Sequence, residues 1–134
     1  MSTIIGCPNF DSREFYCPGV VGIPLEYRGN MQLLAEQLQV VRTLIDRPLH
    51  LNSGWRSKSH NMLVGGVPSS QHLTCKAADV RCAGMSAHDL LQVFEELITA
   101  GNIRQGGLGG YSTFVHYDVR SDTAGKPKKA RWRG

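Results

Sequence analysis

Three residues have the types and the spacing that could bind one metal ion. His72 and Asp79 lie seven residues apart, where a polar loop leads into an alternating apolar stretch, and His116 lies in a later stretch rich in β-branched and aromatic residues. Imidazole and carboxylate groups both suit zinc. Two histidines and one aspartate leave a fourth tetrahedral position open for water, which is typical of a catalytic zinc site. Taken singly, each histidine could equally be a hydrogen-bonded core or surface residue.

Two predicted strands would present these side chains. Residues 77–82 alternate in polarity and place Asp79 on the more polar face of the first strand. Residues 113–119 form the second predicted strand. Because residues two apart in a strand share a face, His116 and Asp118 should point the same way. The turn between His72 and the first strand decides whether all three candidate ligands meet.

Two amphipathic helices are predicted beside these strands. Residues 30–46 carry apolar side chains at helical spacing, after Asn30 as a favourable N-cap. A second helix is expected to begin after Ser86, whose hydroxyl can cap it, and to end at Gly101. A shorter helix is expected at residues 57–63. This mixed order predicts an α+β fold with a small antiparallel sheet flanked by helices.

The chain of 134 residues fits one domain spanning residues 1–134. Residues 1–29 are rich in glycine, proline and turn formers, which predicts an irregular N-terminal wrap. The glycine-rich residues 106–110 are predicted to be a loop at the rim of the cleft. Residues 121–134 form a basic C-terminal segment, which suits either a solvated end or a polyanionic partner such as nucleic acid or an acidic wall polymer.

Several classes of protein are excluded or disfavoured by the composition. No apolar stretch reaches the ~18 residues of a membrane span, so we expect no transmembrane segment. The first residues lack the basic and long apolar regions of a signal peptide. The four cysteines form no Cys-x-x-Cys pair, which argues against a structural zinc knuckle. We expect free thiols, with Cys7–Cys17 or Cys75–Cys82 pairing as the alternative outside the cytoplasm.

Further motifs accompany the three candidate ligands. They are Asn52-Ser53-Gly54-Trp55-Arg56, Asn61, Val64-Gly65-Gly66-Val67, Ser70-Gln71-His72, Phe114-Val115-His116-Tyr117-Asp118-Val119-Arg120 and Ala130-Arg131-Trp132. The set spans roughly residues 10–132 and resembles the zinc D-alanyl-D-alanine carboxypeptidase and endopeptidase family, in its small single-domain branch of phage lysins and bacterial wall hydrolases. That family shares a superfamily with lysostaphin-type endopeptidases and the hedgehog fold, so the resemblance implies a fold of this type.

The resemblance implies that His72, Asp79 and His116 are zinc ligands. It places Arg56 near the substrate carbonyl, where a permanently charged donor can stabilise a developing oxyanion; a structural salt bridge is the alternative.

The resemblance also places Ser70 and Gln71 at the substrate. A turn or cap hydroxyl is the alternative role for Ser70. Trp55 is assigned to the substrate groove, although it and Tyr111 could equally be core aromatics.

The sequence departs from the best-known members of that family at the general base. They carry Glu or Asp three residues before the last histidine ligand, where this chain has Thr113. Asp118 is the nearest substitute. It could act as the general base, or lie behind the ligands and fix an imidazole tautomer or meet Arg56, or be purely structural.

These features predict a zinc metallopeptidase that hydrolyses an amide bond next to a D-amino acid in peptidoglycan stem peptides, without a covalent intermediate. Carboxypeptidase and endolysin endopeptidase activities both stay open. A non-catalytic, zinc-stabilised wall-binding module is the alternative that Thr113 suggests, and a nucleic-acid-binding protein is the one that the basic tail suggests. We expect a monomer without a nucleic-acid partner, made without a signal peptide in a bacterial cytoplasm, phage-encoded, and active on the cell wall after release.

Overall fold

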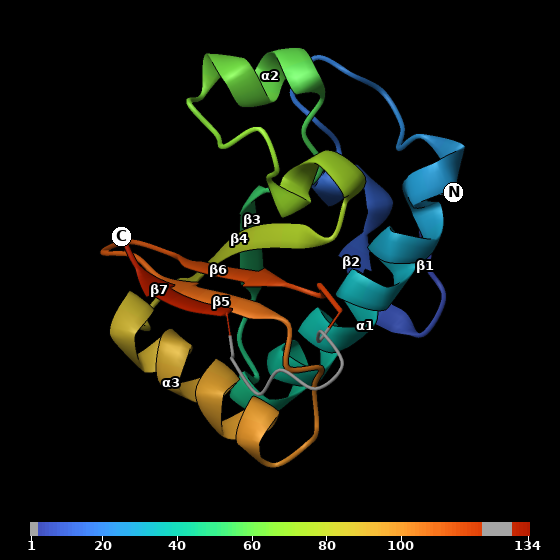
Figure 1. The fold of residues 1–134 in the computed structure, drawn as a ribbon. Coiled ribbons are helices and arrows are strands. Elements are labelled where there is room, and N and C mark those ends of the chain that lie inside the picture. The colour runs from blue at the N-terminus through green and yellow to red at the C-terminus, as the bar shows by residue number, and fades with distance from the viewer. Residues whose placement is uncertain (1–2, 122–129) are drawn as a thin grey trace.

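A five-stranded sheet forms the centre of the fold in the computed structural model, which describes residues 3–121 and 130–134 (Figure 1). In spatial order its strands are β3 (Leu49–Ser53), β4 (Ala77–Cys82), β6 (Val115–Asp118), β5 (Gly107–Gly110) and β7 (Ala130–Arg133). Neighbouring strands pair antiparallel except β7, which runs parallel to β5. The predicted α+β class with a small antiparallel sheet is confirmed, with β7 as the exception.

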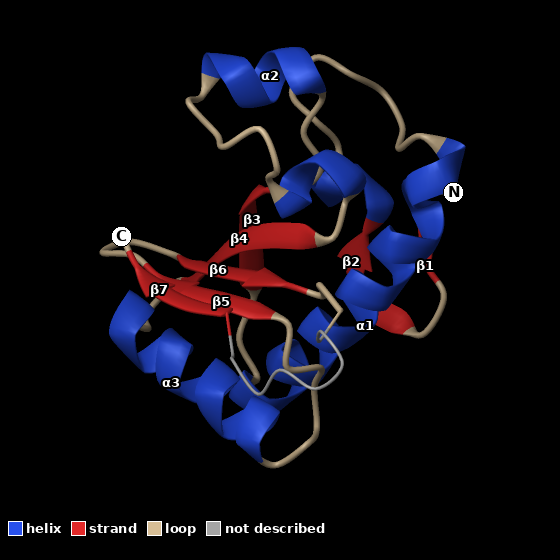
Figure 2. Cartoon of the chain, viewed as in Figure 1, coloured by secondary structure: helices blue, strands red, loops and turns tan. Residues whose placement is uncertain are grey.

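The described residues include three α-helices, and Figure 2 shows α3 below β5 and β7 and α2 at the top of the molecule. They are α1 (Arg28–Ile45), α2 (Lys58–Leu63) and α3 (Ala87–Thr99); the 3-10 turns are η1 (Ser12–Phe15), η2 (Leu25–Tyr27) and η3 (Gln71–Thr74). The Ser86 side chain caps α3 by accepting from the Asp89 amide, as predicted. Helix α1 begins earlier than predicted, and Asn30 does not cap it. The side-chain amide of Asn30 donates instead to the Thr74 carbonyl.

The N-terminal region is more regular than the predicted wrap. Strands β1 (Thr3–Ile4) and β2 (Cys7–Asp11) form an antiparallel pair before η1. Gly6 makes the turn between them with a φ of 76°, a backbone conformation that glycine adopts without strain. Phe10 and Phe15 from this region are buried in the core. The hairpin and η1 therefore replace the first part of the predicted wrap, whereas residues 16–24 contain no helix or strand.

The prediction of a loop at residues 106–110 is wrong, because β5 occupies Gly107–Gly110. Glycine has a low preference for strands, so the local sequence does not indicate one. The structure gives the reason for the glycines: a Cβ at Gly107 would collide with the Asp118 carboxylate, and a Cβ at Gly109 would collide with the Trp132 indole. The missing side chains therefore make room for residues of the neighbouring strands.

Gly106→Ala is expected to lower the free energy of unfolding by more than ~1 kcal/mol. Gly106 has a positive φ of 48°, and an added Cβ would overlap the backbone carbonyl of Asp118, which cannot move without disturbing β6. Gly101→Ala is the matched control, because Gly101 also has a positive φ, 77°, but has no neighbour within 4 Å of an added Cβ. Urea denaturation of both variants measures the difference; equal stability of the two would contradict the clash.

Part of the basic C-terminal segment belongs to the sheet. Residues 122–129 lie outside the described part of the chain, whereas residues 130–133 form β7. Residues 130–133 are therefore not a solvated end.

The four cysteines are buried and free, as predicted. Burial raises the pKa of the Cys75 thiol to about 12, which leaves it protonated near neutral pH. Within residues 3–121 and 130–134, none of the helices combines the length and apolar character needed to cross a membrane.

Candidate metal centre

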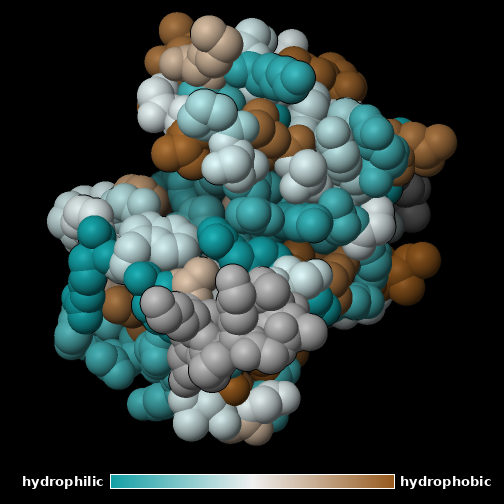
Figure 3. Space-filling model, viewed as in Figure 1, coloured by the Kyte–Doolittle hydropathy of each residue, from teal (hydrophilic) through white to brown (hydrophobic). Residues whose placement is uncertain are grey.

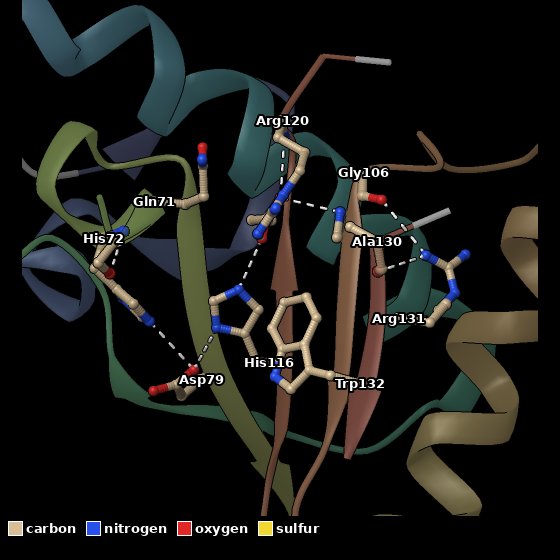
Figure 4. Close-up of polar contacts among 12 residues, drawn as sticks. Gln71, His72, Asp79, Gly106, His116, Arg120, Ala130, Arg131 and Trp132 are labelled. Carbon is tan, nitrogen blue, oxygen red and sulfur yellow. Dashed lines mark hydrogen bonds and ion pairs between the residues drawn. The ribbon is translucent and has the colours of Figure 1, made fainter. Parts of the chain in front are cut away.

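The fold brings His72, Asp79 and His116 together over one face of the central sheet (Figure 4). Asp79 on β4 lies opposite His116 on β6 in the antiparallel register. His72 comes from η3, the 3-10 turn directly before β4, and is 2% exposed. One potential ligand atom from each residue lies within 4.8 Å of the other two. The convergence predicted from sequence therefore holds in the structure.

Each histidine has one ring nitrogen committed to a fixed partner and the other turned toward Asp79. His72 Nδ1 lies 2.7 Å from the Gly54 carbonyl oxygen, so it carries the proton and donates it there. His116 Nε2 lies 2.8 Å from Asp118 Oδ2 and donates to it. Histidines that bind metals typically donate their second N–H to a carbonyl or carboxylate in this way. The free nitrogens are therefore Nε2 of His72 and Nδ1 of His116.

The spacing of these atoms fits a zinc ion. Asp79 Oδ1 lies 3.3 Å from His72 Nε2 and 3.0 Å from His116 Nδ1. In a tetrahedral site with bonds of about 2.0–2.1 Å, ligand atoms lie about 3.3 Å from one another. Two imidazoles and one carboxylate are also a donor set that zinc accepts while keeping a fourth position for water or substrate.

The charges around this cluster couple metal binding to proton release. Burial opposes ionisation of Asp79, but its contacts with His116 and His72 hold its pKa well below the usual range. Burial also opposes the charged form of His116, which lowers its pKa. The hydrogen bonds of His116 to Asp118 and Asp79 outweigh burial and leave the pKa above its ordinary value. A metal ion at His116 Nδ1 therefore has to compete with a proton for that nitrogen.

Asp118 lies behind His116 and is fully buried. One carboxylate oxygen accepts from Arg120 Nε at 2.8 Å and from the Gly107 amide at 3.0 Å; the other accepts from Arg120 Nη2 at 2.8 Å and from His116 at 2.8 Å. A carboxylate with both oxygens occupied and no exposed surface is poorly placed to take a proton from water in a cleft. The geometry therefore does not support the general-base role expected for Asp118. It fixes the tautomer of His116, and its arginine partner is Arg120 rather than Arg56.

A cleft of about 710 Å³ opens at the three candidate ligands. The space-filling view shows this face hollowed below α2, with hydrophilic residues lining much of the hollow (Figure 3). The remaining lining comes from the loops on both sides of α2, from η3, from the β5–β6 hairpin, from the residues after β6 and from β7. It includes Val64 and Val67, Ser70 and Gln71, Tyr111 and Phe114, together with Arg56, Arg120 and Trp132.

Arg56 reaches the metal centre, where it forms an ion pair with Asp79 and also lines the cleft. Its Nη2 lies 3.3 Å from Asp79 Oδ2, so it forms the ion pair of the structural alternative. Its Nη1 and Nε donate to Asn61 and Ser53 at 3.3 and 3.2 Å. It also lines the cleft, as its expected role at the substrate requires.

The three residues expected at the substrate divide between the cleft and the core. Ser70 and Gln71 line the cleft, and the Ser70 hydroxyl also caps η3 by accepting from the His72 amide at 3.2 Å. Trp55 is not part of the lining. It is 8% exposed, and its indole N–H donates to the Leu73 carbonyl at 3.0 Å, so it belongs to the core. The expectation that Trp55 lines the groove is therefore corrected.

Two residues of the site had no role in the sequence interpretation. They are Trp132 and Arg120. The ring centroids of Trp132 and His116 lie 4.9 Å apart, and Cζ of Arg120 lies 5.5 Å from the centroid of the Trp132 ring (Figure 4). Trp132 reaches the site only because β7 pairs with β5, a contact between segments that no local pattern indicates. For Arg120, the signal was its position two residues after Asp118, on the same face of an extended chain.

A family model for the M15 peptidases matches residues 13–118, well over half of the chain, and the match contains His72, Asp79 and His116. No curated protein sequence matches the chain. The resemblance to zinc D-alanyl-D-alanine peptidases is confirmed by this match, and within the described residues His72, Asp79 and His116 form a group that could hold a metal ion. The chain belongs to the M15 peptidase family.

Proposed function

We propose that this protein is a zinc-dependent peptidase that hydrolyses an amide bond next to a D-amino acid in peptidoglycan stem peptides. The observation that carries the proposal is the pair of histidines whose second nitrogens are held by Gly54 and Asp118, so that their free nitrogens converge on Asp79. The cleft beside this cluster is large enough to admit a peptide segment. The M15 family match supports the reaction class.

The chain's own residues would bind and orient the reactants. When held by His72, Asp79 and His116, zinc supplies Lewis-acid chemistry, polarising a carbonyl and lowering the pKa of a bound water to about 7. Arg56 places a permanent positive charge in the same cleft, from which it can donate to an oxygen that becomes negative during hydrolysis. Asp118 keeps the His116 ring in the tautomer that leaves Nδ1 free.

A second function is favoured by the lining of the cleft. Asp79 is the only carboxylate among the described lining residues, and the exposed Thr113 is not one of them. A module that binds zinc and wall peptides without cutting them would not need a general base. This alternative predicts binding to peptidoglycan with no release of fragments.

Digestion of purified peptidoglycan and of synthetic stem peptides, followed by mass spectrometry, separates the two functions. The peptidase is expected to produce new amine and carboxyl ends next to a D-amino acid, and chelation should stop their release. Loss of a single terminal residue would indicate a carboxypeptidase, and internal cleavage an endopeptidase. Binding to the wall without any new ends would contradict the peptidase and favour the binding module.

Arg56→Ala is expected to lower kcat by about 10²–10³-fold while the protein keeps its zinc, because the variant loses a charged donor to the developing oxyanion but none of the ligands. Arg13→Ala is the control, since Arg13 is a surface arginine paired with Asp11 on η1. Zinc content and steady-state rates measured on the same samples separate the two effects. Full turnover of Arg56→Ala would contradict this role.

A further inference from the structure

Three aromatic residues, Tyr111, Phe114 and Trp132, line the cleft and form what we call the aromatic wall. We propose that the Tyr111 hydroxyl donates a hydrogen bond to the substrate carbonyl oxygen as negative charge develops on it. The inference deepens the proposed peptidase function and rests on it. It assigns to a neutral phenol a role that Arg56 alone would otherwise fill.

The Tyr111 ring is held in one position by its neighbours. It stacks on Phe114 with ring centroids 4.4 Å apart and planes 9° from parallel. The Tyr111 amide donates to the Phe114 carbonyl at 3.1 Å, which closes the turn between β5 and β6. Gly134 packs against the ring, where an added Cβ would collide with it. A donor fixed before substrate arrives loses little conformational freedom when the substrate binds.

The hydrogen bonds of the aromatic wall leave one proton unused. Trp132 Nε1 donates to the Tyr111 hydroxyl oxygen at 2.9 Å, and an indole N–H can only donate. The phenol oxygen is therefore the acceptor in this bond, and its own O–H must donate elsewhere. Within residues 3–121 and 130–134, no side chain or carbonyl accepts that proton. Because Tyr111 lines the cleft, water or a bound substrate is its available acceptor.

Trp132 connects this hydroxyl to the metal centre. The indole whose N–H contacts Tyr111 also packs on the His116 ring, with ring centroids 4.9 Å apart. Gly109 makes this arrangement possible, because any side chain there would occupy the space of the indole. The phenol is thus anchored by a residue that packs on a candidate zinc ligand, and it lines the same cleft as the three candidate ligands.

The hydrogen bonds that Arg56 already makes are the chemical reason for a second donor to the substrate oxygen. Its guanidinium already donates to Asp79, Asn61 and Ser53, so part of its hydrogen-bonding capacity is committed before substrate binds. The Tyr111 proton has no such commitment among the described residues. Two donors from different elements aimed at one oxygen also restrict where the carbonyl can lie.

Tyr111→Phe tests the inference, because it removes the hydroxyl and keeps the ring that stacks on Phe114. We expect kcat for a stem peptide to fall roughly 10–100-fold with a smaller change in KM, since a lost oxyanion donor acts mainly in the transition state. Affinity for a phosphinate analogue of the cleaved peptide, measured by calorimetry on the zinc-loaded protein, should fall by a similar factor. Zinc content should stay at the wild-type level. Tyr27→Phe is the control, since Tyr27 in η2 does not line the cleft.

The outcomes distinguish this inference from the function on which it rests. If the wild type cleaves stem peptides and Tyr111→Phe has the same kcat and the same affinity for the phosphinate, the hydroxyl has no such role and the peptidase proposal stands. If the wild type neither cleaves stem peptides nor binds the phosphinate, both proposals are wrong. A Tyr111→Phe protein that loses zinc or thermal stability in step with its activity would show a structural role and overturn the inference.

Discussion

His116→Ala is expected to lose zinc binding and peptide hydrolysis together. His116 is 8% exposed and provides one of three candidate ligand atoms, and no other described His, Cys, Asp or Glu joins the cluster to replace it. Removing it also leaves the carboxylates of Asp79 and Asp118 without the group that lies between them. We expect zinc content well below one per chain. Activity should drop at least about a thousandfold, because the metal supplies several kcal/mol of transition-state stabilisation.

His88→Ala is the matched control for this experiment, because His88 is exposed on α3 and is not part of the cluster. Metal analysis by mass spectrometry and cleavage rates on the same preparations give both readouts. A His116→Ala protein that holds zinc as wild type does would show that the metal lies elsewhere.

Asp118→Asn is expected to weaken zinc binding by about 10–100-fold, the usual effect of losing a group that orients a metal ligand. Burial opposes ionisation of Asp118, but hydrogen bonds from Arg120 and His116 hold its pKa well below the usual range, so the native group is a carboxylate. Asparagine retains the shape but has only one oxygen to accept with. The His116 ring is then free to adopt the other tautomer, in which Nδ1 carries the proton and cannot bind metal.

Saturating zinc separates this positioning role from general-base catalysis. If Asp118 acts only through His116, most of the lost turnover should return once zinc is raised above the weakened Kd. Asp89→Asn, an exposed change in the first turn of α3, should titrate as wild type does. An Asp118→Asn protein that binds zinc with wild-type affinity and stays inactive would instead favour the general-base role.

The parts of the fold with a local signal could be predicted from the sequence. Strand β4 was expected at residues 77–82, where it occurs, because its alternation is regular. Helix α3 follows from its apolar spacing and from Ser86 as its cap. The three candidate ligands could be identified from residue types and motif spacing, since His72 lies in the turn that directly precedes β4.

The remaining features depend on contacts between distant segments. Strand β5 consists almost entirely of glycines, and such a sequence is typical of a loop. Only the side chains of neighbouring strands that pack against these glycines show why a strand needs them here. Strand β7 is basic and short, and only its pairing with β5 brings Trp132 to His116. The sequence also could not show whether Asp118 acts as a general base or orients His116. That question depends on donors from other segments that occupy its carboxylate, above all the backbone amide of Gly107. Such contacts are set by tertiary packing and leave no periodic pattern in the sequence.

Titration of zinc into chelator-treated protein, while the cleavage of a peptidoglycan stem peptide is followed, tests the central claim most directly. A catalytic centre made of His72, Asp79 and His116 predicts no cleavage without metal. It also predicts a rise in rate that levels off at about one zinc per chain, the stoichiometry of a site with three protein ligands and one open position. Cleavage that persists in chelator, or stoichiometric zinc binding with no cleavage of any stem peptide, would contradict it.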